Sequence, residues 1–362
     1  MGLSWIKMAS YYYMRCNYSL DYHRVYVRGL SNYGLTCCIN ALLQSFSATP
    51  ELLELLNNLV FLRYHPPEEA ELNNVPMQLK NALCAMKDTN HHSPHRDFLD
   101  CLHRHSIHRM HLTRFTEHDA DEIFHSILNL TQKQMTDKDL AEEIRKLYEI
   151  KVETQVMCKE CSHIQKTPNS LYSLPLAIRE GYNTLESCVQ SFAQQQTLRC
   201  GEECYCDRCM MKRPFTHQLK LVSLPSVLCI HLKRFRNDGI TRKLHNRVTF
   251  LETLNMNICN DGQSENAKGY YSLYAVIVHI GTALCGHYTA YIRPTQDQNW
   301  CYADDSTVRQ KKDGLLASVQ KDERECIWIT ERNSAGFSSH DITHNMVKCI
   351  EYFNNRTKVI NI

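Results

Sequence analysis

A cysteine near the start of the chain follows a turn-rich loop whose residue types suit a thiol nucleophile. Asn32 lies in a loop with two glycines, Gly29 and Gly34, and precedes Cys37 by five residues. Apolar residues recur at helical spacing after Cys37, which predicts a helix that begins there. Backbone N–H groups at a helix N-terminus favour a thiolate, and the Asn32 amide is a suitable oxyanion donor. Taken alone, however, a buried structural cysteine is the simpler interpretation of this pattern.

Histidines and carboxylates far downstream supply the other groups that such a site needs. Cysteine catalysis requires a histidine that takes and returns the thiol proton, and a third group that orients the imidazole. His279 falls inside an apolar segment that predicts a strand buried on both faces, whereas His287 follows a glycine at the exposed end of that strand. Catalytic groups occupy such loop ends more often, which favours His287. The residues alone leave Asp304 and Asp305 as competitors for the orienting role.

Two sequence boxes that carry these residues resemble those of the ubiquitin-specific protease family of papain-like cysteine peptidases. Residues 29–44 have the pattern G-L-x-N-x-G-x-T-C-x-x-N-A-x-L-Q, and residues 271–291 have the pattern Y-x-L-x-A-V-x-x-H-x-G followed by G-H-Y-x-A-Y. The resemblance covers about residues 28–306. It implies that the nucleophile is Cys37, the general base His287, its orienting group Asp304, a helper of that group Asp305, and the oxyanion donor Asn32.

Two C-x-x-C pairs predict a metal site. Cys158 and Cys161 form the first pair, and Cys206 and Cys209 form the second. Each pair can hold a metal from two sides of a tight turn, and together they supply the four thiolates of a tetrahedral zinc site. Four reduced structural cysteines are the alternative. In the family that the chain resembles, such knuckles tie together the tip of an extended β region, so we expect a structural zinc.

The resemblance implies an α+β, hand-like fold. The catalytic domain is then expected over residues 28–310, with a helical thumb at 28–145, most of the fingers at 146–225 and most of the palm sheet at 226–310. Residues 1–27 are predicted to be an N-terminal extension that is disordered in part. Residues 311–362 are predicted to be an atypical tail that lacks the closing strand of the family. Its best strand candidate, 326–330, is expected to pair only loosely.

Charge, cysteine content and the search for targeting signals indicate where the protein is located and which partner classes are not expected. With 41 Lys and Arg against 39 Asp and Glu, nothing indicates a nucleic-acid or anionic-membrane partner. No secretory signal or membrane-length apolar run is seen, so a cytoplasmic location is expected, with the nucleus as a second one. In that compartment the 18 cysteines indicate metal binding or catalysis rather than disulfides. The histidine-rich run 91–95 is interpreted as exposed loop, and His231 as a structural residue inside a strand.

Within the family, the chain resembles in particular the branch that removes an interferon-stimulated, tandem ubiquitin-like modifier. It has no large insertions, and Cys38 stands where most members have an aromatic residue. We therefore expect a monomeric thiol isopeptidase that cleaves after the C-terminal Gly-Gly of this modifier and acts as a negative regulator of interferon signalling. The modifier and its protein conjugates are the expected partners, with the type I interferon receptor complex as a further one. The alternatives are a ubiquitin-cleaving deubiquitinase and a catalytically weak scaffold that binds a modifier or receptor.

Overall fold

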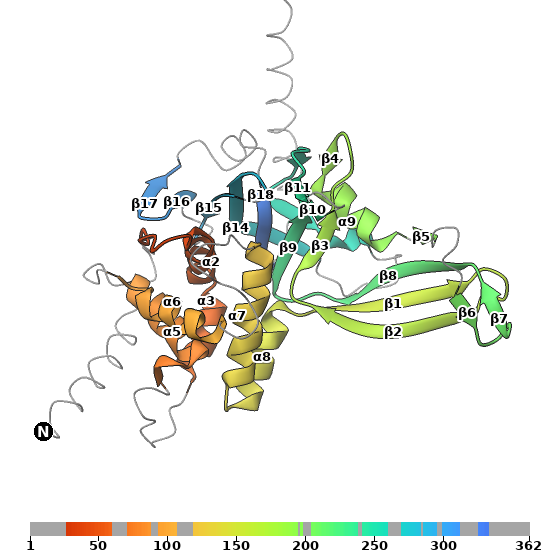
Figure 1. Cartoon of the computed structure of the whole chain (residues 1–362), viewed down its shortest axis with the longest axis horizontal. Coiled ribbons are helices and arrows are strands. Elements are labelled where there is room, and N and C mark those ends of the chain that lie inside the picture. Colours follow the sequence, from red (N-terminus) through yellow and green to blue (C-terminus); the bar gives the residue numbers. More distant parts are fainter. Residues whose placement is uncertain are drawn as a thin grey trace, which may run out of the picture.

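The computed structural model describes residues 27–59, 71–87, 93–106, 119–194, 196–197, 204–237, 241–259, 269–283, 285–294, 299–311 and 325–332. The predicted N-terminal extension lies outside these ranges except for Val27, and so do residues 312–324 and 333–362 of the predicted tail. Except for the helix Leu185–Ala193, which packs against strands, helices and sheets occupy separate parts of the molecule (Figure 1), which confirms the predicted α+β class. Among the helices of these ranges, none has the length and apolar character that crossing a bilayer requires.

Helices form the first half of the described chain and pack around one central helix. Every residue of α2 from Cys37 to Phe46 is buried, because α2 packs against two strands, β15 (Gly286–Ile292) and β14 (Tyr270–Gly281), and against α3, α5 and α7. The amphipathic helices around it turn their apolar faces toward this core. The helices are α2 (Cys37–Ser47), α3 (Pro50–Asn57), α5 (Val75–Met86), α6 (Arg96–Ser106), α7 (Ala120–Gln134) and α8 (Lys138–Tyr148).

A long, thin β arm projects away from the helices (Figure 1). Its four-stranded sheet has the order β2-β1-β8-β5, and the short hairpin β6–β7 lies at its far end. The outer strand β2 is exposed over almost its whole length, so the arm has little apolar core of its own. The strands are β1 (Ile150–Cys158), β2 (Ile164–Leu171), β5 (Gln196–Thr197), β6 (Cys204–Cys206), β7 (Met211–Arg213) and β8 (Phe215–Ser223).

An eight-stranded sheet packs against helix α2. Its order is β17-β16-β15-β14-β18-β9-β3, with β13 beside one end of β14. As predicted, β14 is buried on both faces from Tyr271 to His279. The strands are β3 (Leu174–Ala177), β9 (Val227–Lys233), β13 (Thr253–Asn255), β14 (Tyr270–Gly281), β15 (Gly286–Ile292), β16 (Cys301–Asp304), β17 (Thr307–Gln310) and β18 (Glu325–Arg332).

Smaller elements cover the edge of this sheet near β3 and β9. They are β4 (Asn183–Thr184), α9 (Leu185–Ala193), β10 (Phe235–Asn237), β11 (Thr241–Lys243), β12 (Val248–Thr249) and the 3-10 helix η1 (Met256–Cys259). The fully buried Arg234 donates from Nη1 to the carbonyls of Leu244 and Asn246 at 3.2 and 2.8 Å, which fixes the chain after the β10–β11 hairpin.

The expectation that the chain lacks a closing strand was wrong. β18 lies between β14 and β9, with Trp328 opposite Val276 on one side and opposite Ile230 on the other. The segment 326–330 therefore pairs along both edges in the middle of the sheet instead of loosely, and the described part of this sheet extends to Arg332. The sequence signal was weak because polar residues flank a short apolar piece. Hydrogen bonds from two strands that are remote in sequence decide its conformation.

Candidate active site

The loop before α2 is folded around the side-chain oxygen of Asn32. Oδ1 of Asn32 accepts hydrogen bonds from the backbone N–H groups of Gly34 and Thr36 at 3.0 and 3.2 Å, and from the Thr36 hydroxyl at 3.2 Å. Gly34, with a φ of +90°, makes the turn that these bonds need. Helix α2 then begins at Cys37, so the thiol lies at the N-terminal end of a helix, as the sequence predicted.

His287 and Asp304 form a hydrogen-bonded pair at neighbouring strand ends. His287 is the second residue of β15 and Asp304 the last residue of β16. Nε2 of His287 lies 2.7 Å from Oδ1 of Asp304, and the Tyr302 hydroxyl donates to the other carboxylate oxygen at 3.4 Å. Because Asp304 engages Nε2, the other ring nitrogen, Nδ1, remains for proton exchange with a thiol. Helix α2 packs directly against β15, which places the helix of Cys37 on the strand of His287.

His279, the competing histidine, lies inside the protein rather than at its surface. It is 2% exposed, and its Nδ1 lies 2.9 Å from Nζ of Lys243. Burial and the nearby Lys243 lower the pKa of His279 to about 4, so its imidazole is neutral. A Cβ on Gly286 would lie 2.3 Å from Nε2 of His279, which explains why a glycine precedes His287. The geometry therefore supports His287 as the base and gives His279 a packing role.

Asp305 binds the loop before Cys37 rather than the imidazole. Its Oδ2 accepts from Nδ2 of Asn32 at 2.8 Å and its Oδ1 from Nδ2 of Asn40 at 2.8 Å, whereas Nε2 of His287 is 4.0 Å from Oδ2. Asp305 adopts a φ of +45° in the two-residue turn between β16 and β17, a conformation that Asp tolerates better than most residues. Asp305 thereby fixes the orientation of the Asn32 amide through one of the two hydrogens on Nδ2.

Gly29 allows this connection to form. The backbone N–H of Leu30 donates to the carbonyl of Asp305 at 2.7 Å, and a Cβ on Gly29 would lie 2.1 Å from the carbonyl oxygen of Ser306. Any side chain at residue 29 would therefore push the loop away from the β16–β17 turn. Sequence reasoning missed Asn40, although it lies three residues after Cys37 on the same helical face, a spacing that places it beside Cys37.

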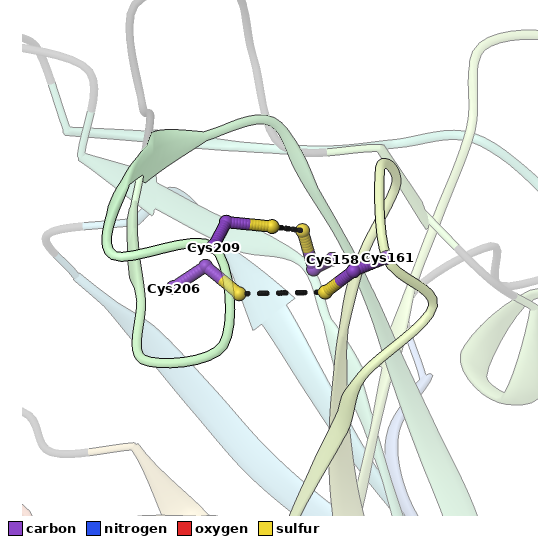
Figure 2. A group of neighbouring side chains, drawn as sticks. All are labelled: Cys158, Cys161, Cys206 and Cys209. Atoms are coloured by element: carbon purple, nitrogen blue, oxygen red, sulfur yellow. Dashed lines mark hydrogen bonds between the residues drawn. The ribbon is translucent and has the colours of Figure 1, made fainter.

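The four cysteines of the two C-x-x-C pairs meet at the tip of the β arm (Figure 2). The Sγ atoms of Cys158 and Cys209 are 4.0 Å apart, those of Cys161 and Cys206 are 3.6 Å apart, and all four lie within 4.8 Å of one another. A tetrahedron with Zn–S bonds of about 2.3 Å has S–S edges of about 3.8 Å, so the donor set fits a zinc ion.

The thiol chemistry of this cluster also suits a cation. Backbone N–H groups, first that of Cys161, lower the pKa of Cys158 to about 7. The pKa of Cys209 is raised to about 12, chiefly by its contact with the sulfur of Cys161 and then by burial. Several thiolates at this spacing repel one another, and a bound metal ion would relieve that repulsion. The cluster can therefore hold a metal ion.

His231 ties the start of α7 to the large sheet. Its Nε2 lies 3.3 Å from Oδ2 of Asp119 and its Nδ1 lies 3.2 Å from Oδ2 of Asp121. Burial alone would lower the pKa of His231, but hydrogen bonds to the two carboxylates raise it to about 9. The imidazolium thus acts as a charged clip between β9 and α7, which agrees with the structural role that the sequence predicted.

Comparisons with known proteins agree with this geometry. The ubiquitin carboxyl-terminal hydrolase family matches residues 28–334, a range that includes β18. The chain belongs to this family, and it is a cysteine-type peptidase of ubiquitin-like modifiers.

The chain is similar to carboxyl-terminal hydrolases of ubiquitin and of ubiquitin-like proteins. The human Ubl carboxyl-terminal hydrolase 18 is 30% identical over 292 residues, which cover 77% of this chain and 76% of the human protein. The mouse protein of the same name is 32% identical over 292 residues, with 77% of both chains covered. Ubiquitin carboxyl-terminal hydrolase 48 of Danio rerio is 28% identical over 306 residues, which cover 81% of this chain and 28% of that protein.

Proposed function

We propose that the protein is a thiol isopeptidase that removes an interferon-stimulated, ubiquitin-like modifier from conjugated proteins by hydrolysis after its C-terminal Gly-Gly. The observation that carries the proposal is the junction at Asp304 and Asp305. Asp304 binds His287 at 2.7 Å, and the next residue, Asp305, binds Asn32 of the nucleophile loop at 2.8 Å. Adjacent carboxylates thus hold the general base and the oxyanion donor beside one helix N-terminus.

The reaction follows from these positions. Nδ1 of His287 accepts the thiol proton of Cys37 while Asp304 stabilises the imidazolium. The thiolate attacks the modifier's terminal carbonyl, and the resulting oxyanion accepts a hydrogen bond from Nδ2 of Asn32. The imidazolium then protonates the leaving lysine amine, which breaks the isopeptide bond and leaves a thioester. Water, deprotonated by His287, hydrolyses the thioester and releases the modifier with a free carboxylate.

The three parts of the molecule correspond to the hand that the family resemblance implies. In this assignment α2 to α8 form the thumb, β1, β2, β5 and β8 form the fingers, and the eight-stranded sheet forms the palm. Zinc is the metal that best suits the four-cysteine cluster of the fingers. Four protein thiolates leave no coordination position for substrate, so its role would be to hold the β6–β7 hairpin against the β1–β2 turn.

A ubiquitin-cleaving activity is the second candidate, because the relative from Danio rerio carries ubiquitin in its name. The scaffold alternative loses its main support, since it rested on a missing closing strand and β18 is present. The same proposal includes a role as negative regulator of interferon signalling and an interaction with the type I interferon receptor complex. It also includes a location in the cytoplasm or nucleus and a monomeric state.

Labelling of the purified protein by two electrophilic probes tests the modifier preference. One probe carries a C-terminal electrophile on the interferon-stimulated modifier, the other carries it on ubiquitin, and Cys37→Ala is the control that neither should label. We expect faster labelling by the first probe, with a thioether to Cys37 identified by mass spectrometry. Faster labelling by the ubiquitin probe would favour the second candidate, and labelling of neither would contradict the enzymatic proposal.

A further inference from the structure

A histidine that the sequence indicated as an exposed loop residue is completely buried beside the nucleophile loop. His95, directly before α6, is 0% exposed, and its Nε2 lies 3.0 Å from the carbonyl oxygen of Ser31. Ser31 immediately precedes Asn32, the proposed oxyanion donor. The interpretation of His95 as exposed was therefore wrong, because the tertiary fold places the start of α6 against the loop before α2.

The contact with Ser31 fixes both the tautomer and the charge of His95. A carbonyl oxygen only accepts, so Nε2 carries the hydrogen, and Nδ1 of the neutral ring is a bare acceptor. Nδ1 has no hydrogen-bond partner among the described residues, and it is buried. Protonation would place an N–H and a charge at this site without an acceptor. In agreement, burial lowers the pKa of His95, although the contact with Ser31 acts in the opposite direction.

This hydrogen bond acts on the peptide plane from which Asn32 extends. The carbonyl of Ser31 and the backbone N–H of Asn32 belong to one planar peptide unit, so holding the oxygen also sets the direction of the Asn32 backbone. Nδ2 of Asn40 reaches the same oxygen at 3.3 Å, but the same amide group also serves Asp305 at 2.8 Å. Nε2 of His95, in contrast, donates to the Ser31 carbonyl and to no other group among the described residues.

Residues beside His95 hold the next part of the loop. The hydroxyl groups of Tyr33 and Ser93 are 2.6 Å apart and share a hydrogen bond. The ring centroids of Tyr33 and His95 lie 5.5 Å apart, and the guanidinium carbon of Arg96 lies 5.5 Å from the centroid of the Tyr33 ring. Ser93, His95 and Arg96 therefore contact the loop residues on both sides of Asn32, while Asp305 holds the Asn32 side chain itself.

We propose that His95 is a positioning residue that orients Asn32 for oxyanion stabilisation by holding the Ser31–Asn32 peptide plane. The inference deepens the proposed function and rests on it. His95 contacts neither substrate nor thiol in this role. Its loss is expected to affect the step in which negative charge develops on the carbonyl oxygen, and to leave modifier binding intact.

The first experiment compares two histidines of the same region that both bind a backbone carbonyl. His95→Leu removes the contact with Ser31, whereas His105→Leu removes the contact of 2.6 Å between His105 and the carbonyl of Asn73 at the other end of α6. Turnover is measured on fluorogenic C-terminal amides of the interferon-stimulated modifier and of ubiquitin. We expect His95→Leu to lower kcat by about tenfold or more with KM changed less than about twofold, and His105→Leu to leave kcat near the wild-type value.

The second experiment asks whether His95 acts through Asn32. In a double-mutant cycle, His95→Leu should cost little further kcat once Asn32→Ala is present, because the group that His95 positions is then gone. Alkylation of Cys37 by iodoacetamide, a reaction without a carbonyl oxyanion, should proceed at the wild-type rate in His95→Leu. His95→Gln, whose Nε2 can donate at the same reach, should restore most of kcat, whereas the shorter His95→Asn should not.

These measurements separate failure of the inference from failure of the proposed function. If the wild-type protein is active but His95→Leu retains full kcat, or its loss adds fully to that of Asn32→Ala, the inference is overturned alone. If His95→Leu does not fold, the Gln and Asn variants decide, and equal kcat for both overturns it. A wild-type protein that hydrolyses neither substrate overturns the proposed function and the inference together.

Discussion

The cysteine cluster at the tip of the β arm and the catalytic centre beside the large sheet both join distant parts of the chain, but they join different kinds of unit. The cluster joins two pairs that are already formed locally, Cys158 with Cys161 and Cys206 with Cys209, so one contact between two hairpins completes it. The catalytic centre joins residues of three segments that no short spacing links, with Asn32 and Asp305 separated by 273 positions.

The two regions also differ in how much apolar core surrounds them. Among the residues that the structure describes, the apolar cluster at the tip has three buried members, Cys158, Cys206 and Phe215, so a metal ion would be the main cross-link there. The catalytic centre rests on the large core under α2, and its polar contacts select an orientation rather than hold the domain together. Changes at the centre should therefore affect turnover, and changes at the tip should affect stability.

The largest expected effect is at the nucleophile. Cys37→Ala should lower kcat by at least about 10⁴-fold, because the thiolate is the group that forms the thioester. Binding of the modifier, measured by titration calorimetry, should stay within a few-fold of the wild-type value. Cys38→Ser, one residue further along α2, is the control and should keep most activity. Loss of probe labelling in the Cys38 variant with retention in the Cys37 variant would reverse the assignment.

The two neighbouring carboxylates should be separable by their partners. Asp304→Ala and Asp305→Ala should each lower kcat by roughly 10- to 10³-fold, but for different reasons. Asp305→Ala should lower kcat little further when Asn32→Ala is already present. The loss of kcat from Asp304→Ala should instead add to the loss from Asn32→Ala. Steady-state kinetics of the three single and the two double variants check this. The opposite pattern of additivity would show that Asp305 orients the imidazole after all.

The central position of β18 predicts a large loss of stability on interruption. Since β18 has neighbours on both sides, no N–H from 327 to 330 points to solvent, and Trp328→Pro removes a ladder hydrogen bond. The unpaired acceptor alone costs roughly 1–3 kcal/mol of unfolding free energy. Lys166→Pro is the control, because the exposed edge strand β2 already contains Pro168 two residues further on. Equal melting temperatures for both variants would contradict the pairing of β18.

Removal of one cysteine ligand should lower stability without changing the chemistry. Metal analysis should find about one zinc per chain, since four thiolates bind one tetrahedral ion. Cys158→Ser should lower the melting temperature by several degrees, because each kcal/mol shifts it by roughly 2–4 °C in a domain of this size. The alkylation rate of Cys37 should not change. Cys204→Ser, an exposed residue of β6 outside the cluster, is the control. Protein purified without chelators that holds no zinc would exclude the site.

The smallest expected effect is a pH dependence at His231. Its folded-state pKa of about 9 exceeds its value of 6.5 in a model peptide, so the folded protein holds the proton more tightly. Its contribution to stability is complete below about pH 6.5, falls as the pH rises, and is lost near pH 9. The contribution is at most about 3 kcal/mol. The free energy of unfolding, measured with urea, should depend less on pH between about 6.5 and 9 in His231→Gln than in the wild-type protein. The exposed His163→Gln should follow the wild-type curve, and an unchanged slope in His231→Gln would contradict the charged clip.

Local pattern determined much of this protein. Two glycines, an asparagine and a helical repeat predicted the start of α2 at Cys37, because turn and helix signals act over a few residues. An apolar run predicted the buried strand β14. The C-x-x-C spacing predicted the composition of the cysteine cluster, since each half is a single turn.

Tertiary structure alone decided the rest. Asp304 and Asp305 look equivalent in sequence, and only the β16–β17 turn directs one toward His287 and the other toward Asn32. β18 was missed because its hydrogen bonds come from β14 and β9, whose positions no local pattern reveals. His95 looked exposed in a polar run, yet the packing of α6 buries it against Ser31. Burial and long-range hydrogen bonding depend on which segments meet, and that is a property of the folded chain.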